Sequence, residues 1–202
     1  MIGMSSTSES VAYFEAIERF MHGDYALCID DFMFLSEKGD ARASLYAAEI
    51  FNRGGDGVNQ NWSKARDLYR RSLSQSYLPG AALGLALMLY RGRGGLRNID
   101  EAKQYFKMLH NNAFSQIMLG IISNNENGCA DNGKEALSYF DNAWLLGHPL
   151  GLKNASIIRF HNGLYVRSAC NFVRAFFLIL WIYGVKRLPI VKSPRDHSEI
   201  LC

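Results

Sequence analysis

Residues 81–109 have the sequence AALGLALMLYRGRGGLRNIDEAKQYFKML, which contains a complete pair of predicted helices. In each half, apolar residues recur every three or four positions, for example at Leu85 and Leu89, as in an amphipathic helix. The segment RGRGG at 91–95 separates the halves and supplies glycines, which tolerate the positive φ of a tight turn. Neither helix can bury its apolar face alone. The stretch therefore predicts a helical hairpin that packs against neighbouring helices.

The second half of this stretch recurs along the chain. In each copy an alanine is followed, three and four residues later, by two large apolar or aromatic residues. The alanines are Ala65, Ala102 and Ala136, which are 37 and 34 residues apart. A period in the mid-thirties with two helices per unit is typical of an α-solenoid, in which stacked repeats bury a shared core.

The turns and helix starts of the repeats share short motifs. These motifs are GDGV at 55–58, GRG at 92–94, and Lys-Ala or Glu-Ala at 64–65, 101–102 and 135–136. In these motifs the chain resembles the Sel-one-like repeats, relatives of the tetratricopeptide repeats, over residues 25–163. Two positions depart from the family pattern: Gly95 stands where a valine is usual, and Glu126 replaces a turn glycine. The resemblance implies a right-handed superhelix that serves as an adaptor for other proteins and is not an enzyme.

The predicted fold class is all-α: a right-handed α-solenoid of antiparallel helix pairs, with about three full repeats and degenerate ends. The full repeats are predicted at 41–76, 79–112 and 113–147. The predicted organisation is a disordered segment at 1–10, the solenoid at 11–167, a hydrophobic terminal helix at 168–187 and a tail at 188–202.

Two helix starts carry a capping-box spacing, in which a glutamate follows an asparagine by three residues. The pairs are Asn98 with Glu101 and Asn132 with Glu135. Each asparagine can accept from a free amide of the first helical turn, and the glutamate can accept from the backbone amide of the asparagine. The spacing therefore predicts that helices begin directly after Asn98 and Asn132.

The residues before the first full repeat predict one more helix pair, at 11–22 and 24–38. Cys28, Phe32 and Leu35 occupy its core positions in the second helix. The exposed face is expected to be acidic, through Glu15, Glu18, Asp30 and Asp31. Since a terminal repeat needs a polar outer face for solubility, we interpret this pair as an amino-terminal cap.

The net charge is +3, but positive and negative charges are segregated along the chain. By segment, residues 1–40 carry −6, 41–110 carry +6, 111–150 carry −3 and 151–202 carry +6. Nucleic-acid-binding proteins usually show a contiguous basic stripe, so this alternation favours a protein partner and predicts no nucleic acid. The arginines of the basic segment are interpreted as solvent-exposed helix faces: Arg66, Arg70, Arg71, Arg91, Arg93 and Arg97.

The cysteines and histidines show no metal-binding spacing. The four cysteines are scattered, and we expect reduced thiols, with Cys28 and Cys170 in helix cores. Four histidines, at 22, 110, 148 and 161, are expected near helix ends, where a protonated ring can meet the dipole at the helix carboxyl end. We predict no metal and no cofactor. The first ten residues lack the pattern of a signal peptide, so the expected location is cytoplasmic.

One segment matches a phosphate-binding pattern, GxxxxGK at 128–134. Glu135 follows it, where a Ser or Thr would hold magnesium, and its carboxylate would repel a phosphate. No strand is predicted before the segment, and the repeat already accounts for its residues. We therefore predict no nucleotide site, and we interpret 92–95 as a turn rather than a dinucleotide-binding loop.

Residues 175–185, AFFLILWIYGV, are continuously apolar. A bilayer span needs about 20 such residues. The segment is shorter, with Arg174 before it and Lys186 after it. One interpretation is the second helix of a final repeat, packed as a lid on the solenoid. The other is a membrane-seeking or partner-docking helix, because a terminal helix should have a polar outer face.

The leading functional prediction is a non-enzymatic scaffold that binds another protein or peptide in a groove lined by the first helix of each repeat. Aromatic, methionine and arginine side chains are frequent anchors of such contacts. The predicted partner-binding residues are Tyr46, Glu49, Arg53, Leu87, Arg91, Met118, Ile121, Asn125 and Asn154. The alternative is a membrane-associated assembly factor attached through 175–185.

Overall fold

The computed structural model of the chain describes residues 5–127 and 133–185. These residues form ten α-helices and no β-strand. The helices are α1 (Ser5–His22), α2 (Tyr25–Glu37), α3 (Ala41–Arg53), α4 (Trp62–Gln75), α5 (Pro79–Arg91), α6 (Ile99–Met108), α7 (Ala113–Asn127), α8 (Lys134–Leu145), α9 (Pro149–His161) and α10 (Tyr165–Val185).

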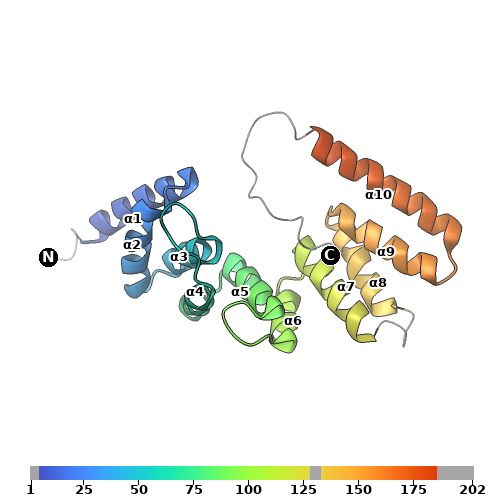
Figure 1. Ribbon diagram of the computed structural model, residues 1–202, viewed down its shortest axis with the longest axis horizontal. Helices are drawn as coiled ribbons and strands as arrows, with labels where there is room; N and C mark the ends of the chain where they lie inside the picture. The colour runs from blue at the N-terminus through green and yellow to red at the C-terminus, as the bar shows by residue number, and fades with distance from the viewer. Residues whose placement is uncertain (1–4, 128–132, 186–202) are drawn as a thin grey trace.

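The helices form consecutive pairs that stack into an open arch, with α1 and α10 at its two ends (Figure 1). The main contacts run between helices that follow each other in the chain. Each odd-numbered helix is the first of its pair, and each even-numbered helix packs against the first helix of the next pair. The predicted α-solenoid is therefore confirmed, and its three central repeats lie where the spacing placed them.

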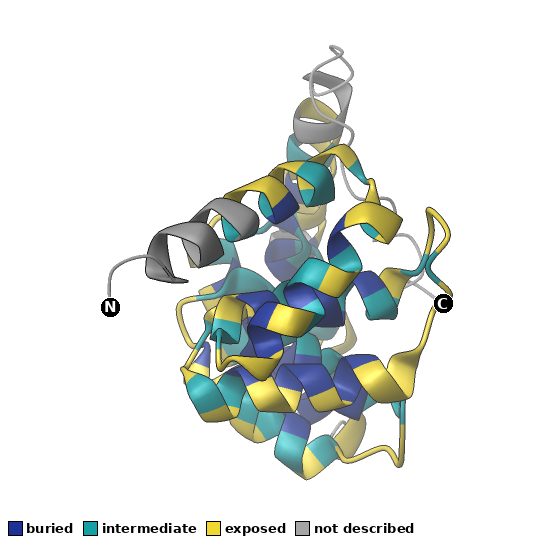
Figure 2. Ribbon diagram, turned by 90° about the vertical axis from the view of Figure 1, so that its left-hand side faces the viewer, coloured by how far each residue is buried: buried dark blue, intermediate teal, exposed yellow. Residues whose placement is uncertain are grey.

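The repeat alanines lie between helices in the core. The side chains of Ala65 and Ala102 are fully buried, and Ala136 is 1% exposed. The first helices also carry small residues where the two helices of a pair approach each other. A Cβ atom added to Gly120 on α7 would lie 2.6 Å from the ring of Phe140 on α8. In Figure 2 the buried positions accordingly lie on the inner faces of the helices, with exposed positions outside. Paired helices approach closely because these positions carry little or no side chain.

The glycines of the hairpin between α5 and α6 meet two different requirements. Gly92 ends α5 in the left-handed conformation, with φ 70°. Gly94 has φ 71°, and a Cβ atom there would lie 2.2 Å from the carbonyl oxygen of Trp62 at the start of α4. The segment is thus the predicted turn, and it also packs against the start of α4 in the previous repeat.

The predicted cap of α6 forms in part. The side-chain oxygen of Asn98 accepts from the backbone N–H of Glu101 at 3.1 Å. The carboxylate of Glu101 accepts from the side-chain amide of Asn98 at 3.1 Å, not from its backbone N–H, which donates to Leu89 O. This difference arises because the incoming loop follows α5 closely. Asn132 lies outside the described residues.

The boundaries at the two ends differ from the expected ones. Helix α1 begins at Ser5, whereas disorder was expected over 1–10. No glycine or proline interrupts this serine-rich stretch, so the helix extends through it. Helix α10 begins at Tyr165, so the boundary expected at 168 falls inside one helix, the second of a fifth pair. No helix within the described residues combines the length and apolarity needed to cross a bilayer.

Two side chains lie elsewhere than predicted. Cys170 was expected in a helix core but is exposed on α10, because Ser168 and Ala175 face the interior instead. His148 was expected at a helix carboxyl end. It lies at the start of α9, and its Nδ1 accepts from the backbone N–H of Leu150 at 3.3 Å.

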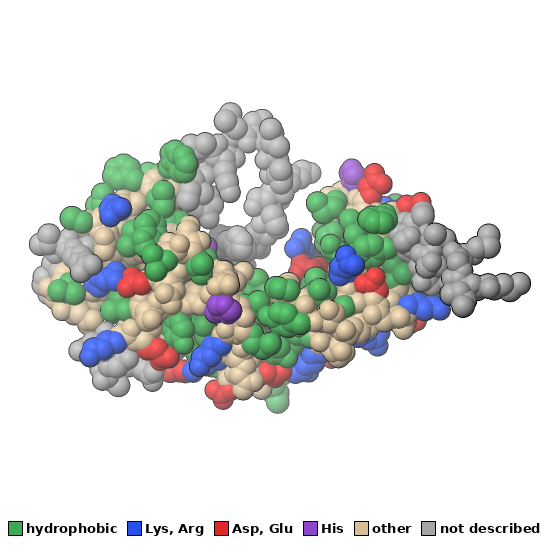
Figure 3. Space-filling view, turned by 180° about the vertical axis from the view of Figure 1, so that it is seen from behind, with side chains coloured by type: hydrophobic (Ala, Val, Ile, Leu, Met, Phe, Trp, Pro, Cys, Tyr) green, Lys and Arg blue, Asp and Glu red, His purple; other side chains and the backbone are tan. Residues whose placement is uncertain are grey.

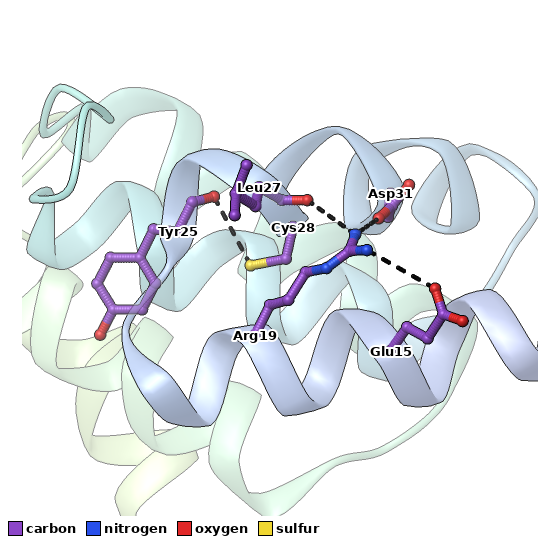
Figure 4. Close-up of polar contacts among 6 residues, drawn as sticks. All are labelled: Glu15, Arg19, Tyr25, Leu27, Cys28 and Asp31. Carbon is purple, nitrogen blue, oxygen red and sulfur yellow. Dashed lines mark hydrogen bonds and ion pairs between the residues drawn. The ribbon is translucent and has the colours of Figure 1, made fainter.

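The first helix pair is joined by a polar bridge, shown in Figure 4. Arg19 on α1 donates to Asp31 on α2 at 3.2 Å and to the carbonyl oxygen of Leu27 at 3.2 Å. The same guanidinium lies 3.7 Å from Glu15. Arg19 therefore neutralises part of the acidic face predicted for this pair and holds its two helices together.

Candidate functional site

The predicted partner-binding residues fall on the first helices α3, α5, α7 and α9, as the repeat register required. We call the side of the molecule formed by these helices the first-helix side. In space-filling view the molecule is hollowed between its amino-terminal and carboxy-terminal parts (Figure 3). The predicted residues differ widely in exposure, and only some of them have side chains available to a partner.

Glu49 and Arg53 form the most ordered polar group on α3. Arg53 Nη2 donates to Glu49 Oε2 at 2.7 Å, and the hydroxyl of Tyr69 on α4 donates to Glu49 Oε1 at 3.0 Å. Tyr25 on α2 lies near Arg53 and helps to raise its pKa. We call Tyr25, Glu49, Arg53 and Tyr69 the α3 network. It links three successive helices, while the Arg53 side chain stays 45% exposed.

Two members of this network, Tyr69 and Arg53, have raised pKa values. Burial raises the pKa of Tyr69 well above its usual value, and the neighbouring Glu49 carboxylate raises it further. Tyr69 therefore remains a neutral donor at physiological pH. Burial acts to lower the pKa of Arg53, but Glu49 and Tyr25 outweigh it and raise that pKa. Arg53 is thus a cation, and its contact with Glu49 orients the guanidinium.

Tyr46 is half-buried beside this network. Its ring stacks on Phe32 with 5.2 Å between centroids and meets Phe20 edge to face at 5.0 Å. These contacts join α3 to both helices of the first pair. Tyr46 therefore presents a rigid, partly exposed aromatic edge.

The apolar members of the predicted set belong largely to the core. Met118 is 3% exposed and cannot serve as a surface contact, so its prediction is corrected. The residues from 115 to 120 are all buried, because α7 packs on both sides and joins the two core clusters. Leu87 and Ile121 are partly buried against the core.

The polar members of the set lie nearer to the surface. Arg91 ends α5 and is exposed, as Arg53 ends α3. Asn125 is exposed near the end of α7, and Asn154 is half-buried on α9. Arg53, Arg91 and Asn125 thus occupy the last turns of three successive first helices.

Three of the arginines expected on solvated faces make specific contacts with the protein. Arg66 is buried and donates to the carbonyl oxygen of Leu96 at 3.1 Å. Arg93 stacks over the ring of Trp62 at 5.0 Å, and Arg97 over Tyr90 at 5.2 Å. The exposure of Arg66 and Arg93 was therefore overestimated, because the hairpin loop between α5 and α6 folds back on α4 of the preceding repeat. The other four arginines of the set are exposed as predicted.

Tyr25 and Tyr69 are members of the α3 network that the sequence analysis missed. Tyr69 had been assigned only as a core aromatic residue. The equivalent residues of the next repeats are Phe106 and Phe140, so the added hydroxyl was a signal for a polar partner.

Two features of the described residues concern metal binding and thiol chemistry. No group of three or more His, Cys, Asp or Glu side chains among them is placed to hold a metal ion. Burial, with a contribution from Asp31, raises the pKa of Cys28 to about 11, so this thiol is a poor nucleophile. Residues 128–132 of the GxxxxGK segment lie outside the described part of the chain.

The architecture defines the class of protein: an α-solenoid of stacked helix pairs with a polar network on its first-helix side. Within that class the chain has the Sel1-repeat fold, as two solved structures show. It is similar to c5321, a protective antigen present in uropathogenic Escherichia coli strains that displays an SLR fold, with TM-score 0.72 and 17% identity. It is also similar to a Sel1 repeat protein from Oxalobacter formigenes, with TM-score 0.63 and 19% identity.

The two similarities cover most of this chain but different shares of the other two. Each extends over 86% of this chain, but over 39% of the Escherichia coli protein and 76% of the Oxalobacter formigenes protein. No model of a known protein family and no curated protein matches the sequence. The likeness therefore concerns the fold.

Proposed function

We propose that this protein is a non-enzymatic scaffold that binds an extended, acidic segment of another protein on its first-helix side. The observation that carries this proposal is the α3 network. Its exposed arginine is oriented by Glu49, so binding a carboxylate costs less side-chain entropy. An arginine can present its fork of donors to a carboxylate in a bidentate arrangement.

Position within the repeats supports an extended partner. Arg53 and Arg91 end successive first helices, so a peptide running across the repeats would meet both cations in turn. Tyr46 offers an aromatic edge one turn before Glu49, suited to an apolar side chain between the acidic ones. The repeat fold is a scaffold that hosts many functions, so the argument depends on these residues and not on the fold.

Selection from a random displayed peptide library tests the proposal. We expect enriched peptides to contain at least two acidic residues, and a synthetic peptide from the pool to bind by fluorescence anisotropy. The variant Tyr46→Ala, Arg53→Ala, Arg91→Ala should weaken that binding at least about tenfold, or 1.4 kcal/mol. Arg71→Ala, which removes an exposed arginine of α4, is the matched control. Equal binding by the folded triple variant would contradict the proposal.

The membrane-associated alternative concerns a different surface. Phe176, Phe177 and Trp181 on α10 are exposed, and such side chains can enter a lipid interface. Co-sedimentation of the full chain with phosphatidylcholine and phosphatidylserine vesicles tests this second function. The cytoplasmic location expected from the sequence stays a prediction.

A further inference from the structure

The two end helices have outer faces that no other described helix covers. Inside the molecule, every second helix packs against the first helix of the next pair, as α8 packs against α9. The second helix α10 and the first helix α1 lie at opposite ends of the arch (Figure 1). By the pattern of the internal repeats, the outer face of a second helix packs against a first helix. The outer face of α10 is therefore suited to packing against a first helix, and the outer face of α1 is suited to packing against a second helix.

The uncovered face of α10 is apolar and contains one cation. Its exposed apolar residues form what we call the terminal apolar surface: Phe172, Val173, Phe176, Phe177, Leu180 and Trp181. Arg174 lies in the same row as Phe177 and Trp181, at helical spacing, and is exposed.

The uncovered face of α1 is a matching stripe that contains one anion. Phe14 and Met21, seven residues apart on α1, are 69% and 76% exposed. Glu18 lies between them on the same face and is exposed. Among the described side chains, each end helix therefore carries exposed apolar residues with a charge in the same row, and the charges of Glu18 and Arg174 are opposite.

The wider charge distribution agrees with this complementarity. Helices α1 and α2 contain six acidic side chains and one basic one, whereas α9 and α10 contain four basic side chains and no acidic one. The two ends of the molecule therefore attract each other when two copies meet head to tail.

Junctions inside the solenoid already use such ion pairs. Lys103 on α6 lies 2.6 Å from Glu126 on α7, and Asp141 on α8 lies 2.6 Å from Arg159 on α9. Both pairs join a second helix to the first helix of the next repeat. An arginine on α10 facing a glutamate on α1 would repeat the polarity of the junction between α6 and α7.

We propose that the terminal apolar surface binds α1 of a second copy of this chain, with Arg174 facing Glu18 of that copy. The solenoid then continues from one molecule into the next, as α9 continues α8. This contact is heterologous, so each bound copy still offers a free α1 or α10. Association therefore produces head-to-tail oligomers that lengthen with concentration.

Sedimentation velocity over a concentration series tests the proposal with the full chain. We expect the native chain to shift from monomer to dimer and longer species as its concentration rises. Glu18→Arg and Arg174→Glu should each weaken association at least about tenfold, because each places like charges opposite one another. Arg71→Ala is the matched control, and circular dichroism verifies that every variant stays helical. A native chain that stays monomeric throughout would overturn the proposal.

Mixing the two variants separates this arrangement from a symmetric contact. In a one-to-one mixture, Arg174 of the Glu18→Arg chain meets Glu18 of the Arg174→Glu chain, and the reversed charges also meet. Head-to-tail binding therefore predicts that the mixture associates far more strongly than either variant alone. An α10-to-α10 dimer does not involve Glu18, so Glu18→Arg alone would leave its association unchanged, and that result would overturn the proposal.

Vesicle binding provides the last discriminating outcome. If α1 covers the terminal apolar surface, oligomers should bind phosphatidylcholine and phosphatidylserine vesicles no better than a Phe177→Ser, Trp181→Ser variant does. A monomeric chain that binds vesicles through these residues would mean that a lipid surface, not a second copy, occupies the face.

Discussion

The hydroxyl of Tyr69 on α4 donates a 3.0 Å hydrogen bond to the carboxylate of Glu49 on α3. At the positions equivalent to Glu49, the next repeats have Leu87 and Ile121, and their counterparts of Tyr69 are phenylalanines. The same place in the repeat thus holds either a polar pair or an apolar pair. The polar pair occurs where the candidate site lies.

A double-mutant cycle should reveal the coupling between these two residues. Tyr69→Phe removes the hydrogen bond, and Glu49→Leu leaves the buried hydroxyl without its carboxylate partner. Each single change should cost about 1–3 kcal/mol, whereas the double variant should cost less than their sum by at least about 0.5 kcal/mol. Urea unfolding measures all four free energies. Additive costs would show that the two side chains do not interact.

Tyr69 should also make stability depend on alkaline pH. Its pKa is raised in the folded protein, so the unfolded chain releases this proton first as the pH rises. The stabilisation is complete below about pH 10, the usual tyrosine value, and is lost above it. Tyr69→Phe should therefore flatten the fall in unfolding free energy above about pH 10. Tyr77→Phe, at an exposed tyrosine, should leave the profile unchanged.

The two described cysteines should differ sharply in reactivity. Cys170 is exposed, whereas Cys28 is fully buried and its pKa is raised to about 11. With an aromatic disulfide reagent at pH 8, Cys28→Ser should leave the fast phase of thiol release unchanged, and Cys170→Ser should remove one thiol from it. Loss of a fast thiol in Cys28→Ser would contradict the burial of this side chain.

Gly94→Ala should test the close approach between the α5–α6 turn and α4. The new methyl group would lie 2.2 Å from the carbonyl oxygen of Trp62, at a residue with φ 71°. Gly147→Ala is the matched control, because its φ is 87° but nothing lies within 4 Å of the added Cβ. The control should cost about 1 kcal/mol and Gly94→Ala at least about 2 kcal/mol more. Equal costs in thermal unfolding would show that only the backbone angle matters.

Periodicity alone was enough to predict the helix pairs. Alanines 37 and 34 residues apart predicted the register, and all three are buried between helices. The start of α6 after Asn98 also followed from local chemistry, since the cap involves residues only three positions apart. These features depend on short-range spacing, which a single sequence records directly.

Exposure was harder to predict because it depends on neighbouring helices. Met118 appeared to face outward from the phase of its own helix, yet α7 is covered on both sides. Arg66 carries a charge, but the hairpin loop of the next repeat buries it. The α3 network likewise joins α2, α3 and α4, so its members are brought together by packing and not by spacing. Spacing therefore predicted which helices carry the candidate residues, but not the contacts between them.

The account depends most on the repeat alanines lying between packed helices. The free energy of unfolding of Ala102→Asp, set against that of Ala169→Asp on the exposed side of α10, tests this directly. A carboxylate forced into the α5–α6 interface should cost at least about 3 kcal/mol, and the control less than about 1 kcal/mol. Equal stability of the two variants would place Ala102 at the surface and contradict the stacked-repeat architecture.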